Sequence, residues 1–477
     1  MAAILTDRFR VVFAEKFKEA IAIGENPIAV ASGLIQPTTV WLFFAKAVQW
    51  DNNVVLDPTD NQQDSYKIYD QIIGLKKIPS SEIRQVIRNN TWVSNTIYDI
   101  YRDDYGSVIS TGGTTTNYVQ GLNFEQHLYE TNFYVVTSEY KVYKCISNNK
   151  NSPSTVEPSS ISAAPFTLSD GYVWKYMFTI NANDFEKFKT DEYIPIPATS
   201  VTSNRIPAST NFGGSIYNVV IESSGTGYAS NTTYDIVGDG QNGQVRITSV
   251  SQSGAITGVS VINPGSGYTY AQINLGTGTG GSLTPVISPK EGIAVDFGRE
   301  LGGYRIALHA KLEKDDFAFG NDFSVVGLLY NPTMTTSSSV AIGTKQLLLS
   351  SPLSGTLEYN DLPIRVTQHS SGSLAIGETP ATGRIVHYEP SNGIIYFTQE
   401  NEVGVGMNSD GKRAVFLPGD TISIGSDQET AVISSQNEAV KTSELVRCSG
   451  EIIYIDNRST ISRAEDQTED FKIILEF

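Results

Sequence analysis

The clearest match to a chemical motif is a glycine-rich run, Gly276-Thr277-Gly278-Thr279-Gly280-Gly281, which has the spacing of a dinucleotide-binding loop. Such a loop binds a pyrophosphate only when a helix follows and presents its N-terminus to the phosphates. The next residues, 282–289, include Pro285 and Pro289 and have the composition of extended chain. We therefore interpret the run as a glycine turn within a β-structure.

Other residue types that support catalysis or metal binding are scattered along the chain. The sequence has no paired metal-ligating histidines or cysteines, no hydrolase-type serine motif and no phosphate-binding loop. We expect each of the four histidines to lie apart from a second ligand: His127, His309, His369 and His387. The sequence therefore predicts no catalytic residue, no cofactor and no metal ligand, and we interpret the protein as a non-enzyme.

Two acidic doublets, Asp103-Asp104 and Asp315-Asp316, have the residue types of a glycosidase pair or a cation site. Each lies beside other charged residues in a segment rich in turn formers, so we interpret both as solvated turns. A polysaccharide-degrading enzyme stays an alternative, since it requires two carboxylates facing each other across an aromatic groove.

Composition limits the classes of partner. A chain of 477 residues predicts two to four domains, and its net charge of −17 disfavours nucleic acid and anionic lipid. The most apolar window, 40–48, is too short to span a bilayer, and the N-terminus lacks the pattern of a signal peptide. Two cysteines, Cys145 and Cys448, favour folding in a reducing cytoplasm. We expect both to be buried free thiols, with a bridge between them as the less favoured alternative.

Hydrophobic periodicity predicts a mainly β protein with few helices. Helical spacing covers 6–22, and a second helix is predicted over 65–73, capped by Asp64 and ended by Gly74. A buried strand is predicted over 38–47, and hairpins over 132–145 and 383–399. Aromatic residues in 89–106 are interpreted as wedges between two sheets, with a sugar-binding ladder as the alternative.

An internal repeat begins near residue 212. Ser223-Ser224-Gly225-Thr226-Gly227-Tyr228 recurs forty positions later as Asn263-Pro264-Gly265-Ser266-Gly267-Tyr268, and the apolar strand before each copy also matches. Each copy predicts a strand and a glycine turn with the tyrosine packed over it. Because one copy cannot bury its apolar face alone, we expect the two to pack on each other as a small β-domain.

The last stretch, 450–477, contains two strand-like runs, 451–456 and 471–477, separated by a predicted turn at 456–459 and a charged loop, 463–470. The second run alternates between apolar and charged residues, as a strand with one buried face requires. We expect this terminal strand to complete a sheet that begins far upstream. Gln467 is interpreted as structural, with its amide satisfying backbone groups of the last loop.

Three stretches of the sequence resemble a known family. They are GEIIYIDNR followed by DQTED at the C-terminus, DGYVWKYMF at 170–178, and the apolar run 305–334 that contains Asn331-Pro332. In this order they resemble the baseplate wedge subunit that is gene product eight of T4-like contractile-tailed bacteriophages. The segments 211–292 and 335–440 have no counterpart in that family, so we interpret them as inserted β-modules.

The resemblance implies a multi-domain β-sandwich protein with two inserted small β-domains. One discontinuous sandwich would comprise 1–90, 293–334 and 441–477, and a second would comprise 91–210. The implied function is structural: a virion protein of the tail baseplate, assembled in the host cytoplasm. It would be a homodimer that contacts other wedge subunits and transmits the baseplate rearrangement on infection, without nucleic acid, membrane insertion or a small-molecule substrate. A carbohydrate- or receptor-binding tail adhesin is the alternative.

Overall fold

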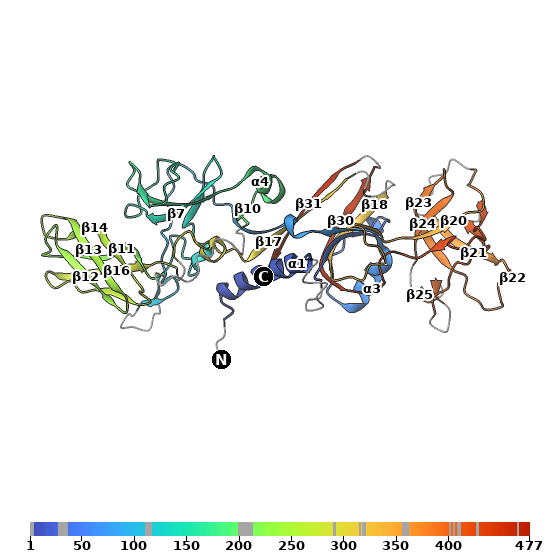
Figure 1. Ribbon diagram of the computed structural model, residues 1–477, viewed down its shortest axis with the longest axis horizontal. Coiled ribbons are helices and arrows are strands. Elements are labelled where there is room, and N and C mark those ends of the chain that lie inside the picture. The colour runs from blue at the N-terminus through green and yellow to red at the C-terminus, as the bar shows by residue number, and fades with distance from the viewer. Residues whose placement is uncertain are drawn as a thin grey trace. The chain divides into compact units, whose positions relative to one another are not determined.

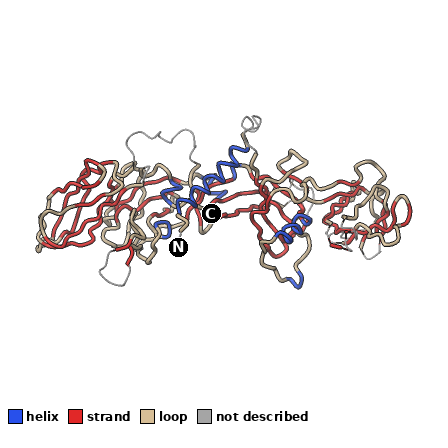
Figure 2. Tube along the Cα trace, turned by 90° about the horizontal axis from the view of Figure 1, so that it is seen from below, coloured by secondary structure: helices blue, strands red, loops and turns tan. Residues whose placement is uncertain are grey.

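The computed structural model describes residues 4–26, 37–109, 117–198, 213–289, 292–313, 316, 321–354, 362–399, 402–403, 406–407, 412–425, 429–464 and 467–477. Antiparallel sheets dominate these residues, which confirms the prediction of a multi-domain, mainly β fold with few helices (Figures 1 and 2). The chain divides into two compact units. Unit 1 comprises 1–16, 84–307 and 474–477, and unit 2 comprises 17–83 and 308–473. No helix in the described ranges combines the length and apolar character needed to cross a membrane.

Four α-helices occur in the described residues: α1 (Asp7–Gly24), α3 (Gln62–Gln71), α4 (Ala182–Phe188) and α5 (Phe297–Leu301). Helix α1 confirms the periodicity over 6–22. Helix α3 begins earlier than predicted, because the side chain of Asn61, not Asp64, is the cap and accepts a hydrogen bond from the Asp64 N–H at 2.9 Å. It ends before Gly74, which lies inside the next strand.

The main sheet of unit 2 has the strand order β19-β2-β1-β18-β30. Its strands are β1 (Val40–Ala45), β2 (Ile72–Ile78), β18 (Asn321–Tyr330), β19 (Val340–Ile342) and β30 (Glu451–Arg463). Every residue of β1 is buried, as its uninterrupted apolar sequence predicts. Three stretches far apart in the sequence therefore meet in one sheet, and its core includes Phe43, Leu75 and Leu329.

A separate sheet of unit 2 is built from the second predicted insertion. Its strand order is β28-β27-β21-β23-β24-β20-β29, with β22 paired to β21. The strands are β20 (Lys345–Leu348), β21 (Pro363–His369), β22 (Gly372–Ser373), β23 (Thr382–Glu389), β24 (Ile394–Thr398), β27 (Thr421–Ile424), β28 (Glu429–Val432) and β29 (Val440–Lys441). The predicted hairpin over 383–399 is confirmed as β23 and β24. A short parallel pair, β25 (Glu402–Val403) and β26 (Gly406–Met407), also lies in this region.

In unit 1, the sheet β6-β7-β9-β8 is covered by apolar side chains on both faces. Its strands are β6 (Tyr134–Val136), β7 (Lys141–Ser147), β8 (Phe166–Thr167) and β9 (Val173–Thr179), and a small hairpin, β4 (Val108–Ile109) with β5 (Asn117–Tyr118), lies in the same unit. Tyr98 packs with Trp174 in one cluster, whereas Tyr101 packs with Phe133 in the other. These aromatic residues are therefore core wedges, as expected, and do not form an exposed ladder.

The internal repeat of unit 1 forms two sheets, β11-β16 and β14-β13-β12-β15 (Figure 1). The strands are β11 (Ile216–Thr226), β12 (Thr233–Gly238), β13 (Gln241–Val250), β14 (Ile256–Ser266), β15 (Ala271–Ile273) and β16 (Thr279–Ile287). The copies exchange strands, since β11 of the first pairs with β16 of the second, and β14 of the second pairs with β13 of the first. One apolar cluster results, which confirms that the copies pack on each other.

Each repeat tyrosine lies against glycines of the other copy. Tyr268 covers Gly240 and Gly243, while Tyr228 covers Gly278 and Gly281. A Cβ at Gly240 would lie 2.5 Å from Cγ of Tyr268, and one at Gly278 would lie 2.6 Å from Cε1 of Tyr228. The glycine-rich run therefore leads into a strand, β16, and makes room for an aromatic ring, which confirms its interpretation as part of a β-structure.

The C-terminal stretch differs from its prediction at one point. Residues 456–459 do not turn, because β30 continues through them, although its pairing with β18 is irregular after Asn457. Asp456 and Asn457 are turn formers, but here they pair with Val326 and Val325, and the Asn457 amide donates to the Leu56 carbonyl at 2.8 Å. Long-range partners thus outweigh the local turn preference.

The last strand, β31 (Glu469–Glu476), belongs to a sheet with the order β10-β3-β17-β31. The other members are β3 (Ile83–Arg88), β10 (Tyr193–Pro195) and β17 (Arg305–Leu312). Phe471 and Ile473 are buried and Lys472 is exposed, so the expected alternation holds there. Ile474 and Leu475 are both half-buried, so the alternation of buried and exposed residues does not continue to the end of β31.

Candidate functional site

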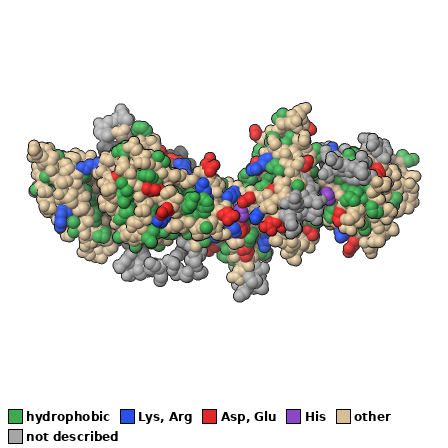
Figure 3. Space-filling model, turned by 90° about the horizontal axis from the view of Figure 1, so that it is seen from above, with side chains coloured by type: hydrophobic (Ala, Val, Ile, Leu, Met, Phe, Trp, Pro, Cys, Tyr) green, Lys and Arg blue, Asp and Glu red, His purple; other side chains and the backbone are tan. Residues whose placement is uncertain are grey.

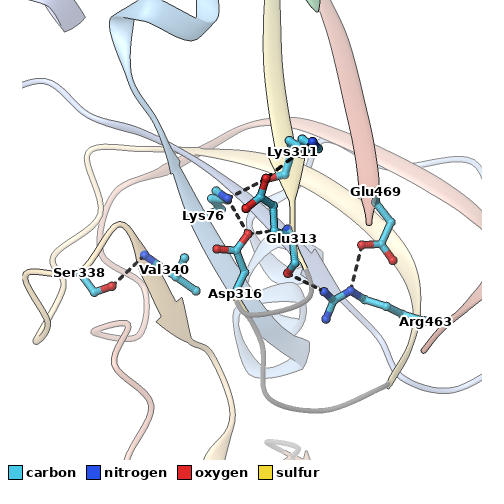
Figure 4. A network of polar contacts seen from close by, with 8 residues as sticks. All are labelled: Lys76, Lys311, Glu313, Asp316, Ser338, Val340, Arg463 and Glu469. Carbon is cyan, nitrogen blue, oxygen red and sulfur yellow. Dashed lines mark hydrogen bonds and ion pairs between the residues drawn. The ribbon is translucent and has the colours of Figure 1, made fainter. Parts of the chain in front are cut away.

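The C-terminal loop is held by a buried arginine (Figure 4). Arg463, at the end of β30, has a side chain with 0% exposure and donates from Nε to the Glu469 carboxylate at 2.9 Å. It also donates from Nη2 to the Glu313 carbonyl at 3.2 Å. A guanidinium removed from water needs such partners, so this contact fixes the last two strands relative to the turn at Glu313.

The same region contains Asp316 of the second acidic doublet (Figure 4). Its carboxylate accepts from Nζ of Lys76 at 2.5 Å and from the Glu313 N–H at 2.7 Å. Lys76 also donates to the Lys311 carbonyl at 2.6 Å. Asp316 is thus part of a half-buried ion pair, and its interpretation as a solvated turn residue is wrong; Asp315 lies outside the described residues.

The first acidic doublet is also engaged by protein groups. Asp104 accepts two hydrogen bonds from the guanidinium of Arg102, both at 2.8 Å. Asp103 accepts from the Ile287 N–H at 3.0 Å. Asp104 is half-buried and held by Arg102, which corrects its interpretation as solvated, whereas Asp103 is exposed in a bend, as expected.

Gln467 lies where the terminal loop turns. The side-chain oxygen of Gln467 accepts from the Ala464 N–H at 3.2 Å. The backbone N–H of Gln467 donates to the Ala464 carbonyl, also at 3.2 Å. The side chain therefore satisfies a backbone group, as expected. Asp466 of the same motif lies outside the described residues.

Replacing Gln467 with alanine is expected to lower the free energy of unfolding by about 1 kcal/mol, because the Ala464 N–H loses its acceptor. Urea unfolding of the purified chain measures this change. Thr468→Ala removes an exposed neighbouring side chain and serves as the matched control. Equal stability of the two variants would show that the Gln467 amide has no structural role.

Two histidines have neighbours that the sequence did not reveal. His309 lies between Glu82, at 2.6 Å from Nδ1, and Asp470, at 3.0 Å from Nε2. His369 lies between Asp420 and Glu378, each at 3.0 Å from one ring nitrogen. The expectation of isolated histidines is wrong for this pair, because carboxylates more than a hundred residues away in the first case are brought beside the ring by the fold.

Each of these histidines has a carboxylate within 3.0 Å of each ring nitrogen. In each case the carboxylates lie on opposite ring nitrogens and do not converge on one point. Within the described ranges, no group of three or more His, Cys, Asp or Glu side chains is arranged to hold a metal ion. An ionised carboxylate only accepts hydrogen bonds, so His369 donates to both Asp420 and Glu378 when it carries a proton on each ring nitrogen.

The stability of the β21 region is therefore expected to depend on pH. Hydrogen bonds to Asp420 and Glu378 raise the pKa of His369 above its usual value. The stabilisation should be fully present below about pH 6.5 and should disappear as the pH rises through the raised pKa. His369→Gln is expected to cost about 1–2 kcal/mol near pH 6 and much less near pH 9. Thermal unfolding at a series of pH values measures this difference.

His127→Gln is the control for that series, because the His127 side chain is half-exposed and its Nδ1 lies 3.8 Å from the Asp7 carboxylate. The effect of His127→Gln on stability should be several-fold smaller than that of His369→Gln and should change little across the pH series. A His369→Gln effect that does not shrink on raising the pH would exclude the doubly protonated ring.

The two cysteines have different environments. Cys145 is buried, and its burial raises the pKa of the thiol well above the usual value. Cys448 is exposed and has a left-handed backbone with φ of 58°, so its predicted burial is wrong. Both are free thiols.

Unit 1 contains a polar cleft with a volume of about 600 Å³, between the repeat and the loops of the preceding sheet. Its walls include Asp99, Arg102, Tyr105, Gln120, Asn148, Asn218, Glu222, Ser224 and Thr257. Of these positions, only Tyr105 is one of the aromatic residues in 89–106, for which the sequence suggested sugar binding as an alternative. These cleft residues come from five segments with no shared motif, and outside 89–106 their signal was the abundance of asparagine and serine near predicted turns.

A buried ion pair in unit 1 was also not predicted. Lys144 of β7 and Glu300 of α5 have side chains with 0% and 2% exposure, and Nζ lies 2.7 Å from Oε2. The only signal was a lysine within the apolar strand sequence of β7. Elsewhere, acidic and basic side chains are intermingled on the face drawn in Figure 3, without a continuous basic surface.

Comparison of this sequence with models of known protein families and with curated proteins finds no match.

Proposed function

We propose that this protein is a structural subunit of the baseplate wedge in a contractile phage tail. It would assemble in the host cytoplasm, become part of the virion, and contact other wedge subunits. The proposal rests on the resemblance of three stretches to the gene product eight family. No catalytic group is needed for this role, because wide β-sheet faces are suited to large, permanent interfaces.

The observation that best supports the proposal is the pairing of two resembling stretches. Strand β18, from the stretch 305–334, pairs along most of its length with β30, which carries GEIIYIDNR. The third stretch, DGYVWKYMF, includes β9, whose Trp174 is fully buried. The resembling residues are thus framework strands, which is where a shared fold would preserve its sequence.

The adhesin alternative loses its main support. It relied on the glycine–tyrosine repeat, but the rings of Tyr228 and Tyr268 are 6% and 2% exposed. Neither ring has a free face on which a sugar could stack. The repeat tyrosines therefore stabilise the module itself.

The family resemblance predicts a homodimer at about micromolar concentration, a range in which large obligate interfaces remain associated. Light scattering coupled to size exclusion measures the mass of the purified chain. A monomer would count against the wedge assignment. Electron microscopy of intact tails would then locate the chain, and a position outside the baseplate would exclude the proposed role.

A further inference from the structure

We propose that the polar cleft of unit 1 binds a neutral oligosaccharide. Of the three resembling stretches, only Gly171 lines the cleft, and no residue of β9, β18 or β30 does, so this inference does not depend on a role in a baseplate. Its volume of about 600 Å³ lies within the range of small-molecule sites. Amide and hydroxyl side chains are the most numerous polar groups of its lining, beside several aliphatic residues.

The walls of the cleft are held in place by contacts between the repeat and the rest of unit 1. The Asn218 amide of β11 donates to the Ile146 carbonyl at 2.6 Å, and Arg102 donates to the Glu222 carboxylate at 2.7 Å. Outside the repeat, the Asn148 amide of the cleft wall donates to the Tyr98 carbonyl at 2.9 Å. A site whose walls are fixed before binding loses little conformational freedom when a ligand enters.

The charges in the cleft are balanced. Its ionisable acids and bases are Asp99, Glu222, Arg102 and Lys150. The Arg102 guanidinium is neutralised by Asp104 and Glu222, at 2.7–2.8 Å. An anionic ligand such as a phosphate would have to compete with these carboxylates, so the charge pattern favours a neutral ligand.

Several polar groups remain available for a ligand. In the described part of the chain, the side chains of Gln120, Ser147 and Ser224 line the cleft and have no hydrogen-bond partner in the protein. Half-buried Val220 and Val259 line it as well. Hydroxyl edges and C–H faces occur together in sugars, and this mixture of amide, hydroxyl and small apolar groups complements both.

The acids of the cleft are engaged by protein groups. Burial raises the pKa of Asp99, opposed by hydrogen bonds from the Leu122 and Asn132 N–H groups. These bonds, at 2.7 and 3.1 Å, occupy both carboxylate oxygens of Asp99. Glu222 is bonded to Arg102. Both acids are therefore held in fixed positions by protein donors.

The test uses the full chain on a glycan array that displays neutral and acidic oligosaccharides, followed by calorimetric titration with the strongest neutral glycan. The double variant Gln120→Ala, Ser224→Ala removes two ligand contacts without removing any protein hydrogen bond. It is expected to weaken binding about tenfold or more. The control, Gln252→Ala with Ser230→Ala, alters two exposed side chains of the repeat that do not line the cleft and should leave the affinity unchanged.

Three results would overturn the proposal. One is an array on which no neutral glycan binds or acidic glycans bind more tightly. Another is equal affinity of the cleft variant and its control, which would place binding elsewhere. The third is shortening of the titrated oligosaccharide, which would assign a hydrolytic site. Oligomeric state is measured separately, so these outcomes are distinguishable from failure of the proposed function.

Discussion

Replacing Glu300 with leucine is expected to lower the free energy of unfolding by about 3–5 kcal/mol, because it leaves Lys144 charged and unpaired in the core. Nζ of Lys144 lies 2.7 Å from the Glu300 carboxylate and 4.3 Å from the ring centre of Tyr101. The other carboxylate oxygen of Glu300 accepts from the Val295 N–H at 3.0 Å. The substitution thus removes an ion pair and an acceptor for a backbone group.

The loss of stability caused by Glu300→Leu should be smaller at high pH. Burial lowers the pKa of Lys144, and Glu300 opposes this effect. Without the carboxylate, the folded state would hold the lysine proton less tightly than the unfolded chain does. Raising the pH toward the usual lysine range should therefore recover stability, since the unfolded state binds more protons there.

Urea unfolding, followed by hydrogen–deuterium exchange in β7, would measure the local effect of Glu300→Leu. Glu192→Leu is the control, because that side chain is exposed and should change stability by less than about 0.5 kcal/mol. Adding Lys144→Met to Glu300→Leu should recover much of the loss. If the single variant matches the control, the pair does not stabilise the fold.

Replacing Tyr268 with alanine is expected to destabilise the repeat by about 3–5 kcal/mol, as for other buried aromatic side chains. The ring is 2% exposed and fills the space left by Gly240 and Gly243. Its hydroxyl accepts from the Gly243 N–H at 3.0 Å and donates to the Ile236 carbonyl at 3.2 Å. Both a cavity and an unsatisfied backbone group would result.

Two further variants separate these causes. Tyr268→Phe keeps the ring and should cost only about 1 kcal/mol for the lost hydrogen bonds. Tyr270→Ala removes a ring that is 58% exposed and should have little effect. Limited proteolysis of residues 213–289 under native conditions measures the opening of the repeat. Equal cleavage rates for Tyr268→Ala and Tyr270→Ala would show that the tyrosine–glycine contact is not stabilising.

Local patterns in the sequence predicted much of the fold. The periodicity of α1, the buried run of β1, the hairpin β23–β24 and the pairing of the two repeat copies all follow from rules that act over a few residues or one repeat. Burial of Tyr98 and Tyr101 also agrees with the interpretation of the aromatic residues in 89–106 as wedges between two sheets.

The errors arose where distant partners decide the outcome. Asp456 and Asn457 favour a turn locally, but β18 holds them in a strand. His369, Asp316 and Glu300 each acquire a partner that only the fold brings near. The cleft was not predictable for the same reason, since its walls come from segments separated by more than a hundred residues. Ion pairs and cavities are properties of packing, to which a one-dimensional pattern gives little access.

The exchange of tyrosines between the repeat copies restricts how this region can evolve. Ile216, where the chain enters the module, pairs with Ile287, where it leaves, so the whole module can be gained or lost as one cassette. Recombination that deletes a single copy would leave Tyr228 or Tyr268 without the glycines of its counterpart. Descendants of this sequence should therefore carry both copies or neither.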